Sequence, residues 1–106
     1  MIRKKVLAPD RVRQPGNGFA FIPHRFLTDG FLQSLSRHEL ALYLFLVLAS
    51  DKNGISFYGD KSIQSILGLK GNEYTFATSS LIHKNLISHD GTFFQVLSLP
   101  SSAHQL

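Results

Sequence analysis

Residues 36–50 read SRHELALYLFLVLAS, and all ten residues at positions 40–49 are apolar, with no Gly or Pro among them. Ser36 and Glu39 have the S-x-x-E spacing of a capping box, in which each side chain accepts a hydrogen bond from the other residue's backbone amide at a helix start. Leucine and alanine favour helix, so the stretch predicts a helix of about four turns. A helix that is apolar on every face is normally buried, so we expect this one at the centre of the domain, with Leu44 in the core.

The composition is that of one ordinary globular domain. The chain has 106 residues, 43% of them hydrophobic, and it includes nine Phe and no Cys. The lack of Cys excludes disulfides, thiolate catalysis and Cys-based zinc sites, and it suits a reducing cytoplasm. The first ten residues lack the apolar core of a signal peptide, and the apolar helix is shorter than the roughly 20 residues that cross a bilayer. We therefore expect a cytoplasmic protein with no membrane partner.

The net charge of +4 is concentrated in the first 13 residues, because the remaining basic and acidic residues balance. The basic residues of this arm are Arg3, Lys4, Lys5, Arg11 and Arg13, and its one acid is Asp10. Cations on phosphates release counterions, so such an arm is suited to a polyanion. A solvated tail that aids solubility is the alternative interpretation.

The chain divides into a basic flexible arm (1–18), one domain (19–99) and a frayed tail (100–106). Phe19–Ile22 is expected to be extended as far as Pro23, and residues 24–28 to form a helical turn. The apolar residues expected to cover the back of the central helix are Phe19, Phe21, Phe26, Phe31 and Leu35.

Downstream, the pattern predicts a strand over 55–58 and a helix over 61–67, with Asp60 as its N-cap and Gly68 as its C-cap. A longer helix over 72–85 follows, ending at a left-handed Asn85. Its core face should carry Tyr74, Ala77, Thr78 and Leu81. A hairpin with Asp90-Gly91 at its turn and a return strand over 92–99 complete the domain.

This order of helix, short strand, short helix, tight turn, longer helix and hairpin resembles the winged helix-turn-helix superfamily. The resemblance lies in Ile63 to Ile87, with Gly68-Leu69 at the turn and Asn85-Leu86-Ile87 before the hairpin. Upstream, FIPHRFL and LSRHELALYLFL are similar to the lead-in helices of small winged-helix proteins of bacterial replication initiation and mobile elements. The resemblance implies a mainly α, α+β fold, with a three-helix core, a small antiparallel β-wing and an N-terminal extension.

The resemblance also implies a function, which is binding to double-stranded DNA by a transcriptional regulator or a replication or mobile-element accessory factor. The second helix of the motif would enter the major groove, beside the wing. By position, its outward residues are Lys70, Asn72, Glu73, Thr75, Phe76 and Ser79. Phosphate contacts would come from Lys61, Lys70, Lys84, His89 and the arm (Arg3, Lys4, Lys5, Arg11 and Arg13). Asn72 can pair with adenine, and Thr75 can contact a thymine methyl or a phosphate.

An alternative function is protein–protein interaction or dimerisation without sequence-specific DNA binding. Between Asn72 and Asn85 there is one lysine, one glutamate and no arginine, although arginine is the usual partner of guanine. An outward Phe76 can anchor a protein partner, and the very apolar central helix favours a homodimer. A third interpretation is that Phe76 packs under the wing.

Catalysis is not expected, because no pattern indicates a catalytic, metal or cofactor site. The five histidines lack metal-ligand spacing, and His38-Glu39 has Leu42 where the H-E-x-x-H motif needs its second histidine. There is no glycine-rich phosphate loop, and no nucleophile with an adjacent base. Asp29, Asp51, Asp60 and Asp90 fall where turns or caps favour Asp.

Overall fold

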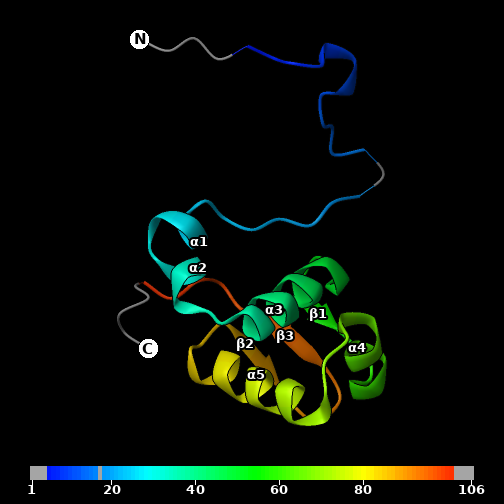
Figure 1. Cartoon of the computed structure of the whole chain (residues 1–106), viewed down its shortest axis with the longest axis vertical. Helices are drawn as coiled ribbons and strands as arrows, with labels where there is room; N and C mark the ends of the chain where they lie inside the picture. The colour runs from blue at the N-terminus through cyan, green and yellow to red at the C-terminus, as the bar shows by residue number, and fades with distance from the viewer. Residues whose placement is uncertain (1–4, 17, 102–106) are drawn as a thin grey trace.

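The computed structural model describes residues 5–16 and 18–101, which form a mainly helical α+β structure with a small three-stranded sheet (Figure 1). In chain order the elements are η1 (Pro9–Arg11), α1 (Arg25–Thr28), α2 (Phe31–Ser34), α3 (Arg37–Ala49), β1 (Ile55–Ser56), α4 (Asp60–Leu67), α5 (Gly71–His83), β2 (Ile87–His89) and β3 (Phe94–Val96). α3 lies in the middle of the body, with α5 on one side of it, α4 near its C-terminal half and the sheet behind.

The start of α3 has the capping box that the sequence predicts. The amide of Ser36 donates to Oε1 of Glu39 at 2.7 Å, and the amide of Glu39 donates to Oγ of Ser36 at 3.2 Å. These reciprocal bonds satisfy two amides that lack an acceptor within the helix. The helix therefore begins at Arg37, directly after the cap.

The prediction that α3 is buried on every face is confirmed for one side of the helix and is wrong for the other. Its buried side chains are Glu39, Leu42, Tyr43, Leu46 and Val47. Leu44 and Leu48, on the opposite side, are 46% and 66% exposed. The elements α4, α5, β1 and β3 pack against α3, as does Phe26 of α1, and they leave this second side open to solvent.

Aromatic rings from α1 and α2 extend the core along α3, as expected for two of the predicted residues. Phe26 stacks on Tyr43 with ring centroids 4.9 Å apart, and Phe31 is completely buried. Phe19 and Phe21 were expected beside them, but each is 74% exposed. The extended segment that carries them borders a groove over Tyr43 without filling it, so these two rings stay outside the core.

The sheet has the order β1–β3–β2, with both pairs antiparallel. Gln95 of β3 pairs with Ile55 of β1 on one side and with Ser88 of β2 on the other. Before β1, the carbonyl of Gly54 accepts the amide of Val96 at 2.8 Å. Gly54 has φ +83°, and a Cβ there would lie 2.6 Å from the Val96 carbonyl oxygen, so this close approach requires glycine.

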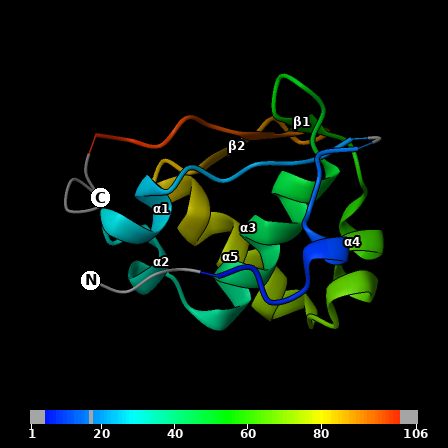
Figure 2. The same ribbon diagram turned by 90° about the horizontal axis from the view of Figure 1, so that it is seen from above.

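The N-terminal arm stands away from the body. The described residues of the arm are solvent-exposed, and Figure 1 places them at the end of the long axis opposite to α5. Viewed along that axis, in Figure 2, they pass in front of the helical body. At the other end of the chain, Nη2 of Arg25 donates to the carbonyl of Pro100 at 2.6 Å, which attaches the start of the predicted tail to α1.

The element order and the small sheet are compatible with a winged helix. The body contains three packed helices (α3, α4 and α5), and a β-hairpin follows the third. Among residues 5–16 and 18–101, none of the helices combines the length and the hydropathy needed to cross a bilayer.

Candidate nucleic-acid interface

The turn between α4 and α5 brings the two helices into a fixed relation. α4 ends at Gly68, which is left-handed with φ +67°, and Leu69 in the turn is buried. Asp60 was expected to cap α4 as the residue before the helix, but the structure places it in the first helical position, after Gly59. Its carboxylate accepts a hydrogen bond from the Tyr74 hydroxyl at 2.5 Å. Asp60 therefore joins the start of α4 to the first turns of α5.

α5 has one buried edge and one exposed edge. The buried edge consists of Tyr74, Ala77 and Leu81, with Thr78 partly buried beside them, as the sequence predicts. The exposed edge consists of Asn72, Thr75, Phe76, Ser79, Ile82 and His83. Asn85, after the helix, has φ +60° and is the predicted left-handed terminator. The exposed edge thus carries no Lys, Arg, Asp or Glu, and it has small polar groups around an exposed phenylalanine and one histidine in its last turn.

Phe76 points into solvent, with 72% of its surface exposed. Its interpretation as a residue packed under the wing is therefore wrong. The ring is therefore accessible to a ligand or partner, although a single exposed aromatic side chain does not by itself mark a binding surface. The position was predictable from helical spacing, because Tyr74 and Ala77 define the buried edge and Phe76 lies outside it.

Glu73 does not point outward as expected. Its Oε1 accepts the amide of Lys70 at 2.8 Å, so the side chain caps its own helix, and its Oε2 lies 3.7 Å from Nε2 of His38 on α3. A carboxylate at the helix N-terminus is favoured by the helix dipole. The Glu73 carboxylate is therefore held away from the exposed edge. The other carboxylate of this region, that of Asp60, is held by the Tyr74 hydroxyl.

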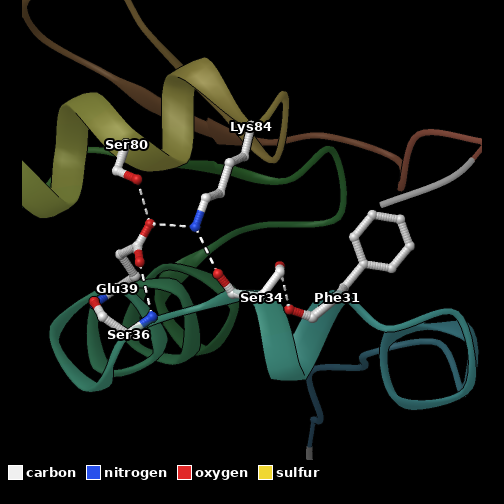
Figure 3. Close-up of polar contacts among 6 residues, drawn as sticks. All are labelled: Phe31, Ser34, Ser36, Glu39, Ser80 and Lys84. Atoms are coloured by element: carbon white, nitrogen blue, oxygen red, sulfur yellow. Dashed lines mark hydrogen bonds and ion pairs between the residues drawn. The ribbon is translucent and has the colours of Figure 1, made fainter. Parts of the chain in front are cut away.

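Lys84 also points toward the body, in contrast to its predicted contact with phosphate. Figure 3 shows its amino group between Glu39 and the backbone of Ser34. Nζ lies 2.9 Å from Oε2 of Glu39 and donates to the Ser34 carbonyl at 2.7 Å. Ser80, one turn earlier on α5, donates its hydroxyl to the same Glu39 carboxylate. These contacts hold the C-terminal part of α5 against the first turn of α3.

Glu39 is the centre of this network and is only 3% exposed. Burial by itself would raise its pKa. Hydrogen bonds from the Ser80 hydroxyl, the Ser36 amide and Lys84 outweigh burial and lower the pKa of Glu39 from 4.5 to about 2. The carboxylate is therefore ionised at neutral pH and paired with Lys84. The capping role was predictable from the S-x-x-E spacing, but the link to α5 had no signal in the sequence.

The exposed cations beside α5 are Lys61 on α4 and Lys70 in the turn. Within the ranges 5–16 and 18–101, neither forms an ion pair, so both amino groups are available to an external anion. Lys70 directly precedes α5, and Lys61 follows Asp60 in the first turn of α4. The hydrogen bonds of Asp60 and Glu73 fix where these two carboxylates lie but do not neutralise them, so the two lysines and the two carboxylates of this region balance in formal charge.

The hairpin is short, and its tip is anionic rather than basic. The turn spans residues 90–93, and Oδ1 of Asp90 accepts the amides of Thr92 at 2.9 Å and Phe93 at 2.7 Å. These bonds lower the pKa of Asp90, so it is ionised. His89, predicted to contact phosphate, instead stacks on the buried Phe94 with centroids 4.0 Å apart. The tip is therefore poorly suited to phosphate.

A pair of exposed rings on the outer face of the sheet was missed by the sequence analysis. Phe57 is 75% exposed and Phe93 is 45% exposed, and their rings meet edge to face at 6.3 Å. The signal was the alternation of strand side chains: Phe94 enters the core, so its neighbour Phe93 must face outward. These rings give the wing an apolar outer surface.

The arm cations that the structure describes are Lys5, Arg11 and Arg13, and all three are exposed. Arg3 and Lys4 lie outside the described residues. The structure therefore does not bring the arm and the exposed edge of α5 together, since they lie at opposite ends of the molecule. Elsewhere in the described part of the chain there is no cluster of three or more His, Cys, Asp or Glu side chains that could hold a metal ion.

Comparison of the chain with protein families, with curated proteins and with solved structures found no match in any of the three. The functional argument therefore depends on the geometry of the α4–α5 unit and on the chemistry of its exposed side chains.

Proposed function

We propose that this chain is a winged-helix DNA-binding protein in which the exposed edge of α5 enters the major groove of double-stranded DNA. The observation that carries the proposal is the two-edged character of α5. One edge is fixed to the body by Glu39 and Asp60, and the other presents Asn72, Thr75 and Ser79 to solvent. A helix with its side chains is about 10–12 Å across, which matches a major groove about 12 Å wide.

The side chains on the exposed edge have the chemistry for base contacts. An Asn72 amide can bond N6 and N7 of adenine together, and the methyl of Thr75 or the ring of Phe76 can pack on a thymine methyl. In this proposal Lys61 and Lys70 supply contacts to phosphates beside the groove. In protein–DNA complexes generally, contacts to the DNA phosphates position the protein, and contacts to the base edges specify the sequence.

In this proposal the arm supplies further phosphate contacts after it moves toward the DNA. From Gly18 back to Lys5 an extended chain spans about 45 Å, which is longer than the 33 and 26 Å shorter extents of the molecule. Gly16 and Gly18, both at positive φ, lie where the arm joins the domain, and glycine has access to more backbone conformations than other residues. As with other basic extensions, the contribution is expected to depend strongly on salt.

A second function is favoured by one observation, the exposure of Phe76 and Ile82 on the same neutral edge of α5. Aromatic side chains in such positions often dominate protein–protein interfaces. We therefore infer a winged-helix interaction module as the alternative. The two functions differ in their response to charge, because DNA binding must weaken when a carboxylate is added to this edge.

Fluorescence anisotropy with a labelled duplex of mixed sequence tests the first function. Thr75→Glu adds one negative charge to the exposed edge, and Gln33→Glu adds the same charge on α2, in a matched control. We expect non-specific binding by the wild type with Kd on the order of 1–100 µM at physiological salt, and tighter binding at low salt. T75E should weaken it at least about tenfold, as like charges repel, and Q33E should leave it near wild type. No binding at low salt, or equal effects of the two substitutions, would reject the proposal.

A further inference from the structure

A groove lies between two segments of the chain that belong to no helix or strand. One wall is residues 19–21, before α1, and the other is residues 97–99, after β3, and Tyr43 and Val47 of α3 also line it. The groove has a volume of about 640 Å³. The proposed contact with DNA uses none of these residues, so the groove is open to another occupant.

The wall after β3 carries an unpaired backbone position at Ser98. On the side of β1, the amide of Val96 donates to the Gly54 carbonyl at 2.8 Å, and on the side of β2 the amide of Leu97 donates at 3.0 Å to the carbonyl that precedes β2. Backbone groups of an antiparallel strand alternate between its two neighbours, so those of Ser98 face the side of β1. β1 begins only after a turn at residues 51–54 and does not cover this position. In the described part of the chain, neither the amide nor the carbonyl of Ser98 has a hydrogen-bond partner.

The wall before α1 is unpaired as well. No backbone amide or carbonyl of residues 19–22 makes a hydrogen bond to another described residue. The Phe19 and Phe21 rings are each 74% exposed, whereas Ile22 packs against the core. An extended segment with unpaired amides and carbonyls is a template for the addition of another strand. Both walls can therefore form backbone hydrogen bonds to an extended chain that enters the groove.

The two walls run in the same direction. Residues 19–22 lead into α1, which begins at Arg25, and residues 97–99 lead to Pro100, whose carbonyl accepts a hydrogen bond from Arg25 at 2.6 Å. Figures 1 and 2 both show these segments passing along the body toward α1. A strand that enters between them in the opposite sense is therefore antiparallel to both, which is the more stable form of pairing.

We propose that the groove receives residues 19–22 of a second copy of this chain, in a two-fold dimer that exchanges this segment. A two-fold axis between the two copies of 19–22 makes them antiparallel. Each copy then lies between the two groove walls of the other chain. The second copy is the occupant because the segment is itself extended, apolar and unpaired in the single chain, so one exchange fills both grooves and pairs both segments. This inference does not depend on DNA binding.

The exchange gives an interface large enough for a specific but reversible dimer. Two four-residue antiparallel segments share about four backbone hydrogen bonds, and Ser98 of each chain adds about two, so roughly eight cross the interface. A standard interface has about ten. The Phe19 and Phe21 rings of two chains expose about 450–750 Å² before association, so covering them with an equal area of the other chain removes at most about 1,500 Å² from solvent. Specific interfaces bury about 1,200–2,000 Å², and we therefore expect a dimer in exchange with monomer.

Sedimentation over a wide range of protein concentration tests the dimer. The full chain should show a monomer–dimer equilibrium. Ala20→Pro removes an amide from the exchanged segment and breaks no hydrogen bond of the single chain, so the dilute protein should melt at the wild-type temperature but dimerise at least about tenfold more weakly. Gln14→Pro removes an amide of the arm that no described residue accepts, and this matched control should dimerise like the wild type. A wild type that stays monomeric, or an A20P variant that dimerises normally, would overturn the proposal.

Hydrogen exchange locates the interface. The amides of residues 19–22 and of Ser98 should exchange more slowly as the protein concentration rises, because they are unpaired in the single chain and become paired in the dimer. The amides of residues 12–14, which also have no hydrogen-bond partner among the described residues, should exchange at a constant rate. A dimer in which residues 19–22 and Ser98 stay unprotected would have its interface elsewhere, and this result would reject the exchange.

A synthetic peptide of residues 14–24 tests whether the groove selects this segment. Labelled peptide should bind the full chain in an anisotropy titration, and excess unlabelled peptide should dissociate the dimer. The same peptide with Ala20→Pro should bind at least about tenfold more weakly, because proline interrupts antiparallel pairing. A peptide that binds while the full chain remains monomeric would assign the groove to another extended chain and overturn the two-fold dimer. A dimer that excess peptide leaves intact would also contradict the exchange.

Discussion

Nζ of Lys84 lies 2.9 Å from Oε2 of Glu39, in an ion pair that joins the end of α5 to the first turn of α3. The two side chains are only 19% and 4% exposed, so the pair is shielded from solvent. Ser80 and Ser36 donate to the same carboxylate, which satisfies most of its acceptor capacity. The pair therefore sets how α5 is held while its opposite edge stays free.

Glu39 should make the stability of the fold depend on acid pH. Because its folded pKa of about 2 lies below the ordinary 4.5, the ionised carboxylate stabilises the fold at neutral pH. That contribution starts to fall near pH 4.5 and is lost as the pH approaches about 2. Glu39→Gln should reduce the free energy of unfolding at pH 7 by roughly 2–4 kcal/mol, in part by leaving Lys84 unpaired.

Urea denaturation of wild type and E39Q at several pH values between neutral and acid measures this effect. Other carboxylates titrate equally in both proteins, so the difference between them isolates Glu39. The difference should narrow as the pH is lowered. A difference that stays constant with pH would mean that the carboxylate has no special pairing in the folded state.

The same substitution should destabilise the fold much more on the buried side of α3 than on its exposed side. Leu42 is completely buried, so Leu42→Asp loses roughly 1.5–3 kcal/mol of apolar burial and also buries an unpaired carboxylate. L42D should not fold. Leu44→Asp should cost less than about 1 kcal/mol in the monomer, because Leu44 is half exposed. Circular dichroism melts of the two variants compare them, and an unfolded L44D would show that α3 is enclosed on both sides.

Phe76 should affect binding but not stability. Its ring is 72% exposed, so Phe76→Ser should change the free energy of unfolding by less than about 0.5 kcal/mol. In contrast, Phe94→Ser empties a core position and should cost about 3–5 kcal/mol. We expect F76S to weaken duplex binding several-fold, measured by anisotropy. If F76S melts normally and binds the duplex like wild type, the ring belongs to a protein contact instead.

The arm should control the salt dependence of duplex binding. Arg11→Gln with Arg13→Gln removes two cations, and the slope of log K against log salt should fall by up to about 1.8, at about 0.9 for each lost phosphate contact. Arg37→Gln with Lys52→Gln removes the same charge at the two ends of α3, away from the arm. Anisotropy titrations at several salt concentrations give both slopes. Equal slopes for the two double variants would show that the arm acts only through net charge.

Local signals in the sequence predicted the helix ends and turns well. The S-x-x-E spacing located the start of α3, Gly68 located the turn after α4, and Asn85 located the left-handed residue after α5. Each of these depends on one or two residues whose backbone preferences are strong, so no tertiary information was needed. Helical spacing likewise identified the buried edge of α5, because its apolar residues are regular.

Two errors are local, because Asp60 is the first residue of α4 instead of its cap and Glu73 bonds the nearby Lys70 amide, and the others concern contacts between distant segments. An unbroken apolar run cannot show that only one side of α3 is covered, and it does not tell Leu44 from Leu46. Lys84 looked like a surface cation because its partner, Glu39, lies far away in sequence on a different helix. Phe19 and Phe21 were expected in the core from hydrophobicity alone. The segment that carries them forms no helix or strand, so no regular structure determines which of its side chains face the core.

The most direct measurement of the central proposal is the set of backbone amide chemical-shift changes on addition of a duplex of mixed sequence to isotopically labelled protein. The proposal predicts that the largest changes lie on the exposed edge of α5, at Asn72, Thr75, Phe76 and Ser79, with smaller changes at Lys61 and Lys70. Changes confined to the arm, or centred on the outer face of the sheet while α5 is unaffected, would contradict a role for α5 in the major groove.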